Sequence, residues 1–439
     1  MHGTGAAWRY HGAAWAAALR AAALPFLASR LLFLVVTVTA PWWRGALGLA
    51  HQRPTDPFGE ATAWATGTLL DRWLQWDAYW YLHIAAHGYA YSAVHHSSVA
   101  FFPLYPLALR AASLVFAPLE LIIRPGPALL ISALLIANAA TLLGLAALYR
   151  LALSLSGAQA ARRAIWVACA FPTALFGAAP YSEGLFFLVT ALFFLDLRND
   201  RWGRAALWSF LAALCRPLGI LLAPCYLLAL WRAHQARAPL VHPGAIAQHN
   251  PDAPVSTGPE VTPRIRRATP ILALLGTLAA PAGLILYGVY LGMTFGHPLA
   301  FAQAHRAWGR AWAWPWMGLI ESVRRPLAHL PVLSSTDWHA LSDLTFTLVA
   351  LAVSLAGWRL LRDEAALYLA LFWLVTLCTP AILNGYPAPL SSMPRFALPI
   401  VPLLLIVAAR PRLARAVIAV GGPWLLLNVA VFVNGGWVA

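Results

Sequence analysis

The sequence predicts a polytopic membrane protein built of helices. Of its 439 residues, 61% are hydrophobic and only 10% are charged, and the mean hydropathy is +0.68. Apolar runs recur from one end of the chain to the other, and several approach the roughly 20 residues that a helix needs to cross a bilayer. No soluble core requires so much apolar sequence, so a soluble class is excluded and residues 1–439 are expected to form a single membrane domain.

The strongly basic balance is interpreted as a topology signal. The formal charge is +15, and all 30 residues counted as Lys plus Arg are arginines. They lie mainly at the ends of apolar runs, as in the cytoplasmic loops of membrane proteins. We therefore expect membrane lipids around this chain and no nucleic-acid partner.

The first predicted span covers residues 21–40 and follows a basic segment that contains Arg9 and Arg20. The run is long for a signal peptide and ends without a small-residue cleavage site, so we expect a permanent anchor with a cytoplasmic N-terminus. Residues 41–125 then turn polar and are predicted to form a first outer loop with interfacial helices, one of them at 101–123. If 101–123 crossed the membrane instead, the arginines beyond the next span would lie outside.

The remaining spans follow from the alternation of apolar runs with arginine-rich ends. The run 205–231 is broken at Arg216, where we predict that two short helices meet near the outer side. Residues 232–268 are predicted to be a flexible cytoplasmic loop and residues 292–340 a second outer loop. This makes eleven predicted crossings, the others at residues 126–149, 164–179, 184–197, 271–291, 341–360, 365–383, 396–408 and 414–433.

Asp77 is the strongest candidate for a catalytic residue. It follows a polar stretch and is flanked by Trp76, Tyr79 and Trp80, which would strip part of its water at a membrane surface. A carboxylate in such surroundings suits a general base. The alternative is that the aromatic residues form an interfacial belt and Asp77 caps a helix, and the spacing alone leaves both interpretations open.

Further polar side chains are predicted to gather at the same outer face. Arg395 and Arg216 are candidates for binding a phosphate through forked hydrogen bonds, although arginines at a membrane surface also snorkel. Glu183 could orient a sugar hydroxyl or cap a helix. The other residues expected on this face are His83, His87, Tyr89, Tyr105, Tyr181, His305, Arg306 and Arg310, of which Tyr105, Tyr181, His305 and Arg310 are candidate substrate ligands.

No metal site or cofactor is predicted. The 4 cysteines lie in apolar stretches without a CxxC pair, so we expect packed thiols rather than disulfides or metal ligands. They are Cys169, Cys215, Cys225 and Cys378.

A series of short motifs runs along the chain. The most specific one is Trp76-Asp77-Ala78-Tyr79-Trp80-Tyr81, with Gly88-Tyr89 and Ala100-Phe101-Phe102-Pro103-Leu104-Tyr105-Pro106 after it. Later landmarks follow in the order Phe171-Pro172-Thr173, Ala179-Pro180-Tyr181-Ser182-Glu183, Arg216-Pro217-Leu218-Gly219, Trp308-Gly309-Arg310 and Ser392-Met393-Pro394-Arg395-Phe396. In these motifs the chain resembles the PIG-V-like mannosyltransferases, relatives of the second mannosyltransferase of GPI-anchor assembly.

The resemblance implies a GT-C glycosyltransferase bundle with interfacial helices at its outer face. Such enzymes transfer a sugar from a polyprenyl- or dolichyl-phosphate carrier to a lipid or glycan acceptor, invert the anomeric centre, and use an acid of the first outer loop as base. Asp77 occupies the matching position. The sequence has no adjacent Asp-Glu pair there, which argues against a metal-bridging role.

Two other functions fit the same composition. A secondary transporter or lipid flippase also places polar groups within a helical bundle, but its charges should lie at mid-membrane on broken helices. A non-catalytic assembly factor would keep its activity without Asp77. As a multi-pass protein, the chain is expected in the plasma membrane if it is bacterial, which its lysine-free, Ala- and Arg-rich sequence suits, or in the endoplasmic reticulum as in eukaryotic relatives.

Overall fold

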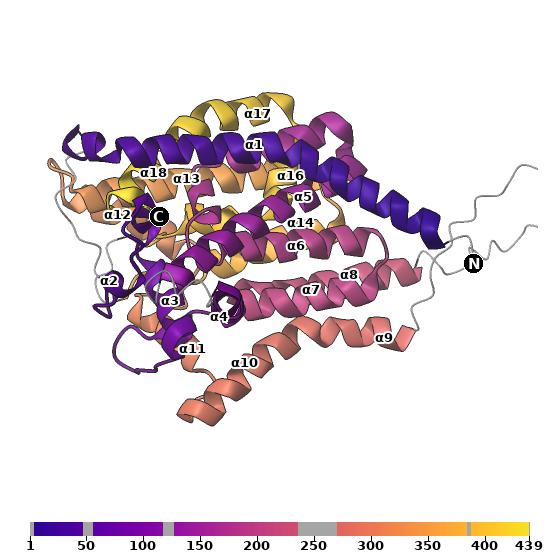
Figure 1. The fold of residues 1–439 in the computed structure, drawn as a ribbon, viewed down its shortest axis with the longest axis horizontal. Helices are drawn as coiled ribbons and strands as arrows, with labels where there is room; N and C mark the ends of the chain where they lie inside the picture. The colour runs from indigo at the N-terminus through magenta and orange to yellow at the C-terminus, as the bar shows by residue number, and fades with distance from the viewer. Residues whose placement is uncertain (1–3, 47–55, 117–126, 236–269, 384–387, 439) are drawn as a thin grey trace, which may run out of the picture.

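The computed structural model describes residues 4–46, 56–116, 127–235, 270–383 and 388–438. Across these residues the secondary structure is helical, with one isolated bridge between Arg310 and Ala381. Helices suit this apolar sequence because each one satisfies its own backbone hydrogen bonds, which lipid cannot do. Figure 1 shows a bundle whose long helices run side by side along the length of the molecule.

Helix α1 (Thr4–Ala46) runs along one edge of the bundle and packs against α5 (Pro127–Cys169) and α18 (Gly422–Val433). Helix α5 is two helices joined at Gly157, whose φ of +80° is a conformation that glycine adopts readily. Asn138, in its first half, hydrogen bonds to Ala178 just beyond the end of its second half, so the two halves are antiparallel. The predicted spans 126–149 and 164–179 are therefore one hairpin. The second span is α-helical only as far as Cys169 and also contains a 3-10 turn (Ala174–Gly177).

The break predicted at Arg216 is confirmed. Helix α7 (Trp202–Cys215) ends there, and Arg216 adopts extended angles of φ −154° and ψ 150° because Pro217 follows it. A short 3-10 turn (Pro217–Leu221) then leads into α8 (Leu222–Gln235). A Cβ atom on Gly219 would lie 2.2 Å from the backbone carbon of Ala212, so this turn packs directly on α7 and requires glycine.

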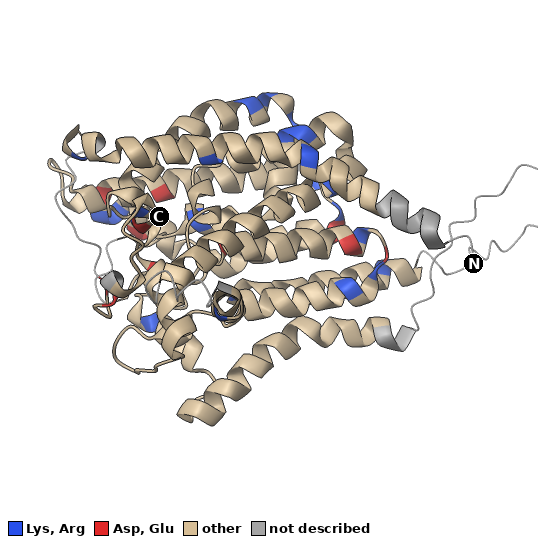
Figure 2. Ribbon diagram, in the orientation of Figure 1, with Lys and Arg blue, Asp and Glu red and all other residues tan. Residues whose placement is uncertain are grey.

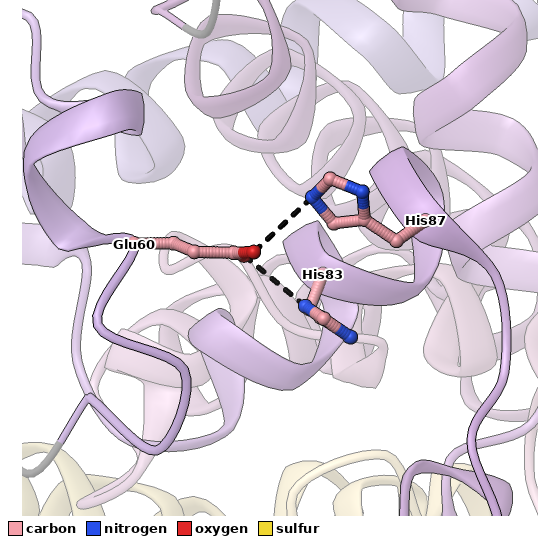
Figure 3. Close-up of side chains that lie close together, drawn as sticks. All are labelled: Glu60, His83 and His87. Carbon is pink, nitrogen blue, oxygen red and sulfur yellow. Dashed lines mark hydrogen bonds and ion pairs between the residues drawn. The ribbon is translucent and has the colours of Figure 1, made fainter.

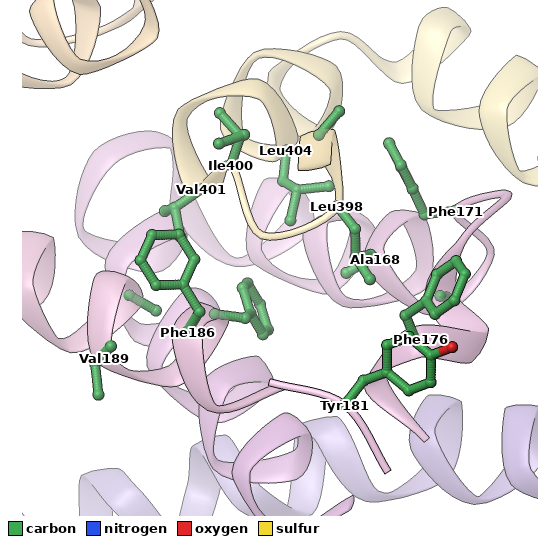
Figure 4. Packing of buried hydrophobic residues seen from close by; sticks show 14 of the residues in the cluster. Ala168, Phe171, Phe176, Tyr181, Phe186, Val189, Leu398, Ile400, Val401 and Leu404 are labelled. Atoms are coloured by element: carbon green, nitrogen blue, oxygen red, sulfur yellow. The ribbon is translucent and has the colours of Figure 1, made fainter. Parts of the chain in front are cut away.

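The rest of the bundle consists of helices of very different lengths. They are α6 (Glu183–Arg198), α9 (Pro270–Leu275), α10 (Ala279–Phe295), α13 (Ser335–Gly357), α14 (Asp363–Leu377), α15 (Met393–Ala397), α16 (Val401–Ala409) and α17 (Pro411–Ala416), which a π-helical turn (Val417–Gly421) joins to α18. Residues 398–404 pack across the buried side chains of residues 168–189, where Phe176, Tyr181 and Phe186 form part of the core (Figure 4).

Six segments are long and apolar enough to span a membrane by length and composition: Gly12–Trp42, Pro127–Cys169, Pro217–Gln235, Ala273–Phe295, Ser335–Leu360 and Pro411–Val433. The predicted count of eleven crossings is not confirmed, because several of the predicted spans correspond to short helices. Helix α6, at 16 residues, is about 24 Å long, against a hydrocarbon core of about 30 Å. A multi-pass helical membrane protein is the conclusion that these elements support.

Residues 41–125, the predicted first outer loop, contain short helices, as predicted. They are α2 (Ala61–Trp64), a 3-10 turn (Leu69–Trp73), α3 (Asp77–His87), another 3-10 turn (Ser98–Ala100) and α4 (Leu104–Phe116). The predicted interfacial helix 101–123 corresponds to α4, and its last part lies outside the described residues, as does nearly all of the loop 232–268. Residues 292–340, the predicted second outer loop, contain α11 (Ala300–Ala307) and α12 (Met317–Ala328).

Figure 2 shows arginines in excess over acidic residues at one end of the bundle and a mixture of both charges at the other end. At one end, Arg163 donates to the carbonyl of Ala408 and Arg232 pairs with Asp363, at the C-terminal ends of α16 and α8. At the other end lie α3, α11, α12 and the C-terminus (Figure 1). The arginine-rich end is the one that charge distribution predicts to be cytoplasmic.

Candidate active site

Asp77 is the first residue of α3, and its carboxylate does not cap that helix. The N-cap position belongs to Trp76, whose side chain makes no capping bond, and the Asp77 carboxylate turns instead to Arg395. Trp76 has φ 52°, an uncommon angle for a residue with a side chain, and its indole donates to the carbonyl of Gly436. This contact with the C-terminal end of the chain helps to fix the start of α3 and the orientation of the Asp77 side chain.

Four charged side chains form one network, in the order Asp77, Arg395, Glu183, Arg216. Nη1 of Arg395 lies 2.6 Å from Oδ2 of Asp77, and its Nε donates to Oε1 of Glu183. The same Oε1 is 2.6 Å from Nη1 of Arg216. Two carboxylates and two guanidinium groups thus alternate, and their formal charges cancel.

Burial makes this pairing obligatory. Glu183 and Arg395 are buried, and the side chain of Asp77, at 16% exposure, is the most accessible of the four. A buried charge is tolerated only with a partner, and removal of one member of a buried pair typically destabilises a protein by about 3–5 kcal/mol. Asp77 is therefore the member of the network that a substrate reaches most easily.

Aromatic rings enclose the two guanidinium groups. Arg395 lies over the rings of Tyr181 and Phe176, with 4.6 and 5.0 Å from its central carbon to the ring centroids. Arg216 lies 5.4 Å from the ring of Phe396, the residue after Arg395. Such contacts favour the charged arginine and keep its plane fixed.

The charged residues are held where helices end. Glu183 is the first residue of α6, and a Cβ on the next residue, Gly184, would lie 2.6 Å from the carbonyl oxygen of Ala137, so this helix end is pressed onto α5. Arg216 lies in the break after α7. Arg395 lies in α15, a helix that begins directly after Ser392, whose φ is 69°. Backbone strain of this kind is concentrated at functional sites in proteins.

Tyr181 and Tyr105 contact residues next to the charged network and hold them in position. The Tyr181 hydroxyl accepts from the backbone N–H of Asp77 at 3.2 Å and donates to the carbonyl of Gln75 at 3.0 Å. Tyr105 donates to the carbonyl of Ala133, and its ring packs edge-on against Tyr81. Both predicted ligands are fully buried, so in this structure they position their neighbours rather than line an opening.

His305 lies in α11, and Arg310 lies between α11 and α12. Arg310 donates to the carbonyls of Thr379 and Ser391 at 2.9 and 3.1 Å, and its guanidinium lies 5.0 Å from the Phe396 ring, so it braces the segment that leads to Arg395. His305 Nδ1 lies 2.6 Å from the carbonyl of Phe301. Burial lowers the pKa of His305, and the charge of Arg310 lowers it further, so this imidazole is neutral at neutral pH. Its described contacts do not join it to the network.

A cavity of about 470 Å³ opens beside α3. Phe58, Trp80 and His96 line it, together with Ser92, Ser97 and Ser98. Trp80 stacks on Phe101 with centroids 5.4 Å apart and planes at 12°. Aromatic faces next to hydroxyl groups suit a sugar, which offers both apolar ring faces and hydrogen-bonding edges.

One cluster of polar side chains near this cavity was not predicted from the sequence. Glu60 lies beside His83 and His87, and the position of Glu60, 23 residues before His83, gives no signal in the sequence. The spacing of the two histidines is the only clue, because residues four apart share a helix face.

Comparison with known proteins gives matches to mannosyltransferases. Residues 26–232 match the family model described as mannosyltransferase (PIG-V). The GPI alpha-1,6-mannosyltransferase 2 of Rattus norvegicus is 35% identical over 153 residues, which cover 35% of this chain and 30% of that protein. The Mus musculus protein of the same name is 34% identical over 165 residues, covering 37% and 32%. The chain spans about a third of the length of these relatives.

Among solved structures, the apo oligosaccharyltransferase of Archaeoglobus fulgidus overlaps with 93% of this chain and 56% of that chain, at a TM-score of 0.40 and 11% identity. An overlap of this degree does not bear on activity. The family match confirms the resemblance for residues 26–232, a segment that contains Asp77, Glu183 and Arg216. Arg395 lies outside it.

Proposed function

Because residues 26–232 carry a PIG-V-like mannosyltransferase sequence, we propose that this chain is a membrane glycosyltransferase. It moves a mannosyl residue from a polyprenyl- or dolichyl-phosphate carrier to a lipid-linked or glycan acceptor. The observation that carries the proposal is the contact between Asp77 and Arg395, a half-buried carboxylate held 2.6 Å from a buried guanidinium at the start of α3. This arrangement supplies a base and a cation side by side.

The donor phosphate binds Arg395 in competition with Asp77. Glu183 holds the Nε side of the guanidinium, so the plane of Arg395 stays in place when another anion takes over its Nη1. Arg216 shares Glu183 and supplies the second positive charge. As the carrier phosphate departs, both guanidinium groups stabilise its growing negative charge through charge-assisted hydrogen bonds.

Donor binding in this scheme releases the base. Once the phosphate occupies Arg395, the carboxylate of Asp77 no longer neutralises that guanidinium and accepts the proton of the acceptor hydroxyl. The acceptor oxygen forms a bond to the anomeric carbon while the bond from that carbon to the phosphate oxygen breaks on the opposite face, and the electron pair leaves with the phosphate. A single displacement of this kind inverts the anomeric centre.

The acceptor sugar is assigned to the cavity beside α3. Trp80 borders this cavity and lies one helical turn from Asp77, which places an aromatic face on the same helix as the base. The network and the cavity lie away from the arginine-rich end of the bundle, and positive charge marks the cytoplasmic side. Transfer therefore takes place at the outer or lumenal face.

Transfer of mannose from a synthetic polyprenyl-phosphate donor by membranes that contain the protein tests the proposal. We expect product with wild type and with Asp200→Asn, which alters an exposed acid at the other end of the bundle, and a loss of product with Asp77→Asn. If neither variant nor wild type forms a glycosylated product while vesicles show lipid translocation, the flippase alternative replaces this proposal.

A further inference from the structure

Glu60, His83 and His87 converge beside α3 and are not members of the charged network (Figure 3). Oε2 of Glu60 lies 3.1 Å from Nδ1 of His83, and its Oε1 lies 3.2 Å from Nε2 of His87. One ligand atom from each residue can be chosen so that all three lie within 4.8 Å of one another. The two rings have centroids 5.0 Å apart.

The positions of these residues on α3 and just before α2 bring the three side chains together. His83 and His87 are four residues apart on α3 and therefore share a face, while Glu60 immediately precedes α2. Phe58 stacks flat on the His83 ring at 3.7 Å and meets Trp80 edge-on at 4.9 Å, which fixes the orientation of that imidazole. The side chains are 27%, 16% and 55% exposed for Glu60, His83 and His87, so the point where they meet is open to solvent.

We propose that Glu60, His83 and His87 bind a divalent transition-metal ion, for which Zn²⁺ is the best chemical match. Two imidazole nitrogens and one carboxylate oxygen are a common ligand set for this ion, and the fourth position is left to water or an anion. Ligand atoms of a tetrahedral zinc site lie about 3.4 Å apart, because the bonds are about 2.0–2.1 Å long. Each carboxylate oxygen of Glu60 lies within a few tenths of an ångström of that spacing from one ring, Oε2 at 3.1 Å from His83 and Oε1 at 3.2 Å from His87.

The third distance of the site is the one between the ligand nitrogens of the two histidines. Rotation of one side chain brings this distance to the value of a zinc site. His87 is the last residue of α3 and is more than half exposed, so its ring turns without disturbing the core. His83 stays fixed by Phe58. Mg²⁺ and Ca²⁺ do not suit this set, because they prefer oxygen ligands.

The ion holds the segment before α2 against α3. Phe58 on that segment lines the cavity beside α3, so metal binding fixes one wall of the cavity. His83 is six residues after Asp77, about 9 Å along the helix axis, so the ion acts on position rather than on the reacting atoms. The proposal does not depend on the transferase activity.

Simple hydrogen bonding is the alternative for this cluster, since two imidazole N–H groups could donate to the two oxygens of Glu60. The two explanations differ in metal affinity. Hydrogen bonding alone predicts no Zn²⁺ affinity beyond that of scattered surface histidines, whereas a built site binds one ion per chain.

The test uses the full-length protein, purified with a tag that contains no histidine, stripped with a chelator and titrated with Zn²⁺ in a calorimeter. We expect one tight site in wild type, a loss of affinity of at least about tenfold in His87→Gln and in Glu60→Gln, and no change in His95→Ala, an exposed histidine of the same loop. Excess Mg²⁺ should not compete.

A second measurement guards against misfolding. Zn²⁺ should raise the midpoint of thermal unfolding of wild type and of His95→Ala, but not of His87→Gln, whose own midpoint without metal should match that of wild type. Equal Zn²⁺ binding by wild type and His87→Gln overturns the proposal, and so does a wild-type protein that binds no Zn²⁺.

Discussion

Replacement of Asp77 by asparagine distinguishes an effect on the rate of transfer from an effect on stability better than any other change in the network. Asparagine keeps the size of the side chain, and its oxygen still accepts a hydrogen bond from Arg395, but it cannot take the proton of an acceptor hydroxyl. A positioned general base contributes about 10²–10⁴ to a rate. We therefore expect transfer to fall by at least about a hundredfold, which corresponds to about 2.7 kcal/mol of activation free energy.

The free energy of unfolding should fall less in Asp77→Asn than in a variant that loses a fully buried member of the network. Arg395 retains Glu183 after the substitution, and Asp77, at 16% exposure, is the most solvated member of the network. The loss is then at most that of one hydrogen bond to a charged group, about 1.5–3 kcal/mol. Glu183→Gln provides the contrast, because the buried Glu183 is the partner of both arginines, and its loss should cost about 3–5 kcal/mol.

Both quantities are measured on the same purified preparations. The initial rate of mannosyl transfer from a polyprenyl-phosphate donor gives the chemistry, and the midpoint of thermal unfolding in detergent gives the stability. Asp200→Asn is the matched control, since its carboxylate is exposed and asparagine tolerates the φ of 52° found there. A wild-type rate in Asp77→Asn refutes the mechanism, and a stability loss as large as that of Glu183→Gln would make Asp77 a structural residue.

Three further predictions follow from the fold and the network. Arg395→Lys should abolish transfer, because one ammonium cannot reproduce the two directed contacts of the guanidinium, and full activity of this variant would reduce Arg395 to an anchor. An impermeant thiol reagent should label His329→Cys from outside and Asp200→Cys only after the membrane is opened, and the reverse pattern would invert the proposed topology. Gly219→Ala should destabilise the protein by about 1–3 kcal/mol through the contact with Ala212, which comparison of unfolding midpoints with wild type will check, and an unchanged midpoint would show that the turn relaxes easily.

Composition and proline placement were enough to predict the class of this fold. The apolar runs predicted a helical membrane protein, and Pro217 within such a run predicted the break at Arg216 that the structure contains. The number of crossings could not be derived in the same way. Helix α16 has only 9 residues and the hairpin at Gly157 keeps helical structure on both sides, so hydropathy alone does not mark where such segments begin and end.

The candidate site was predictable as a set of residues but not as a network. The aromatic motif identified Asp77, and the predicted convergence of Asp77, Glu183, Arg216 and Arg395 at one place agrees with their contacts. Which carboxylate meets which guanidinium depends on the packing of segments far apart in sequence, and no local pattern encodes it. For the same reason Glu60 escaped notice, since its link to α3 exists only in the folded protein.

The chain is synthesised from its N-terminus, and this order matters for Glu183, the carboxylate that Arg216 and Arg395 share. When the ribosome has produced residues 1–232, Asp77 and Glu183 face a single arginine of the network, and the nascent site carries one excess negative charge. An unpaired carboxylate is poorly tolerated away from water, so this part of the bundle cannot close until the segment that carries Arg395 arrives. Completion of the charged network therefore requires the segment that carries Arg395, and a chain that stops before this segment leaves one carboxylate without its arginine.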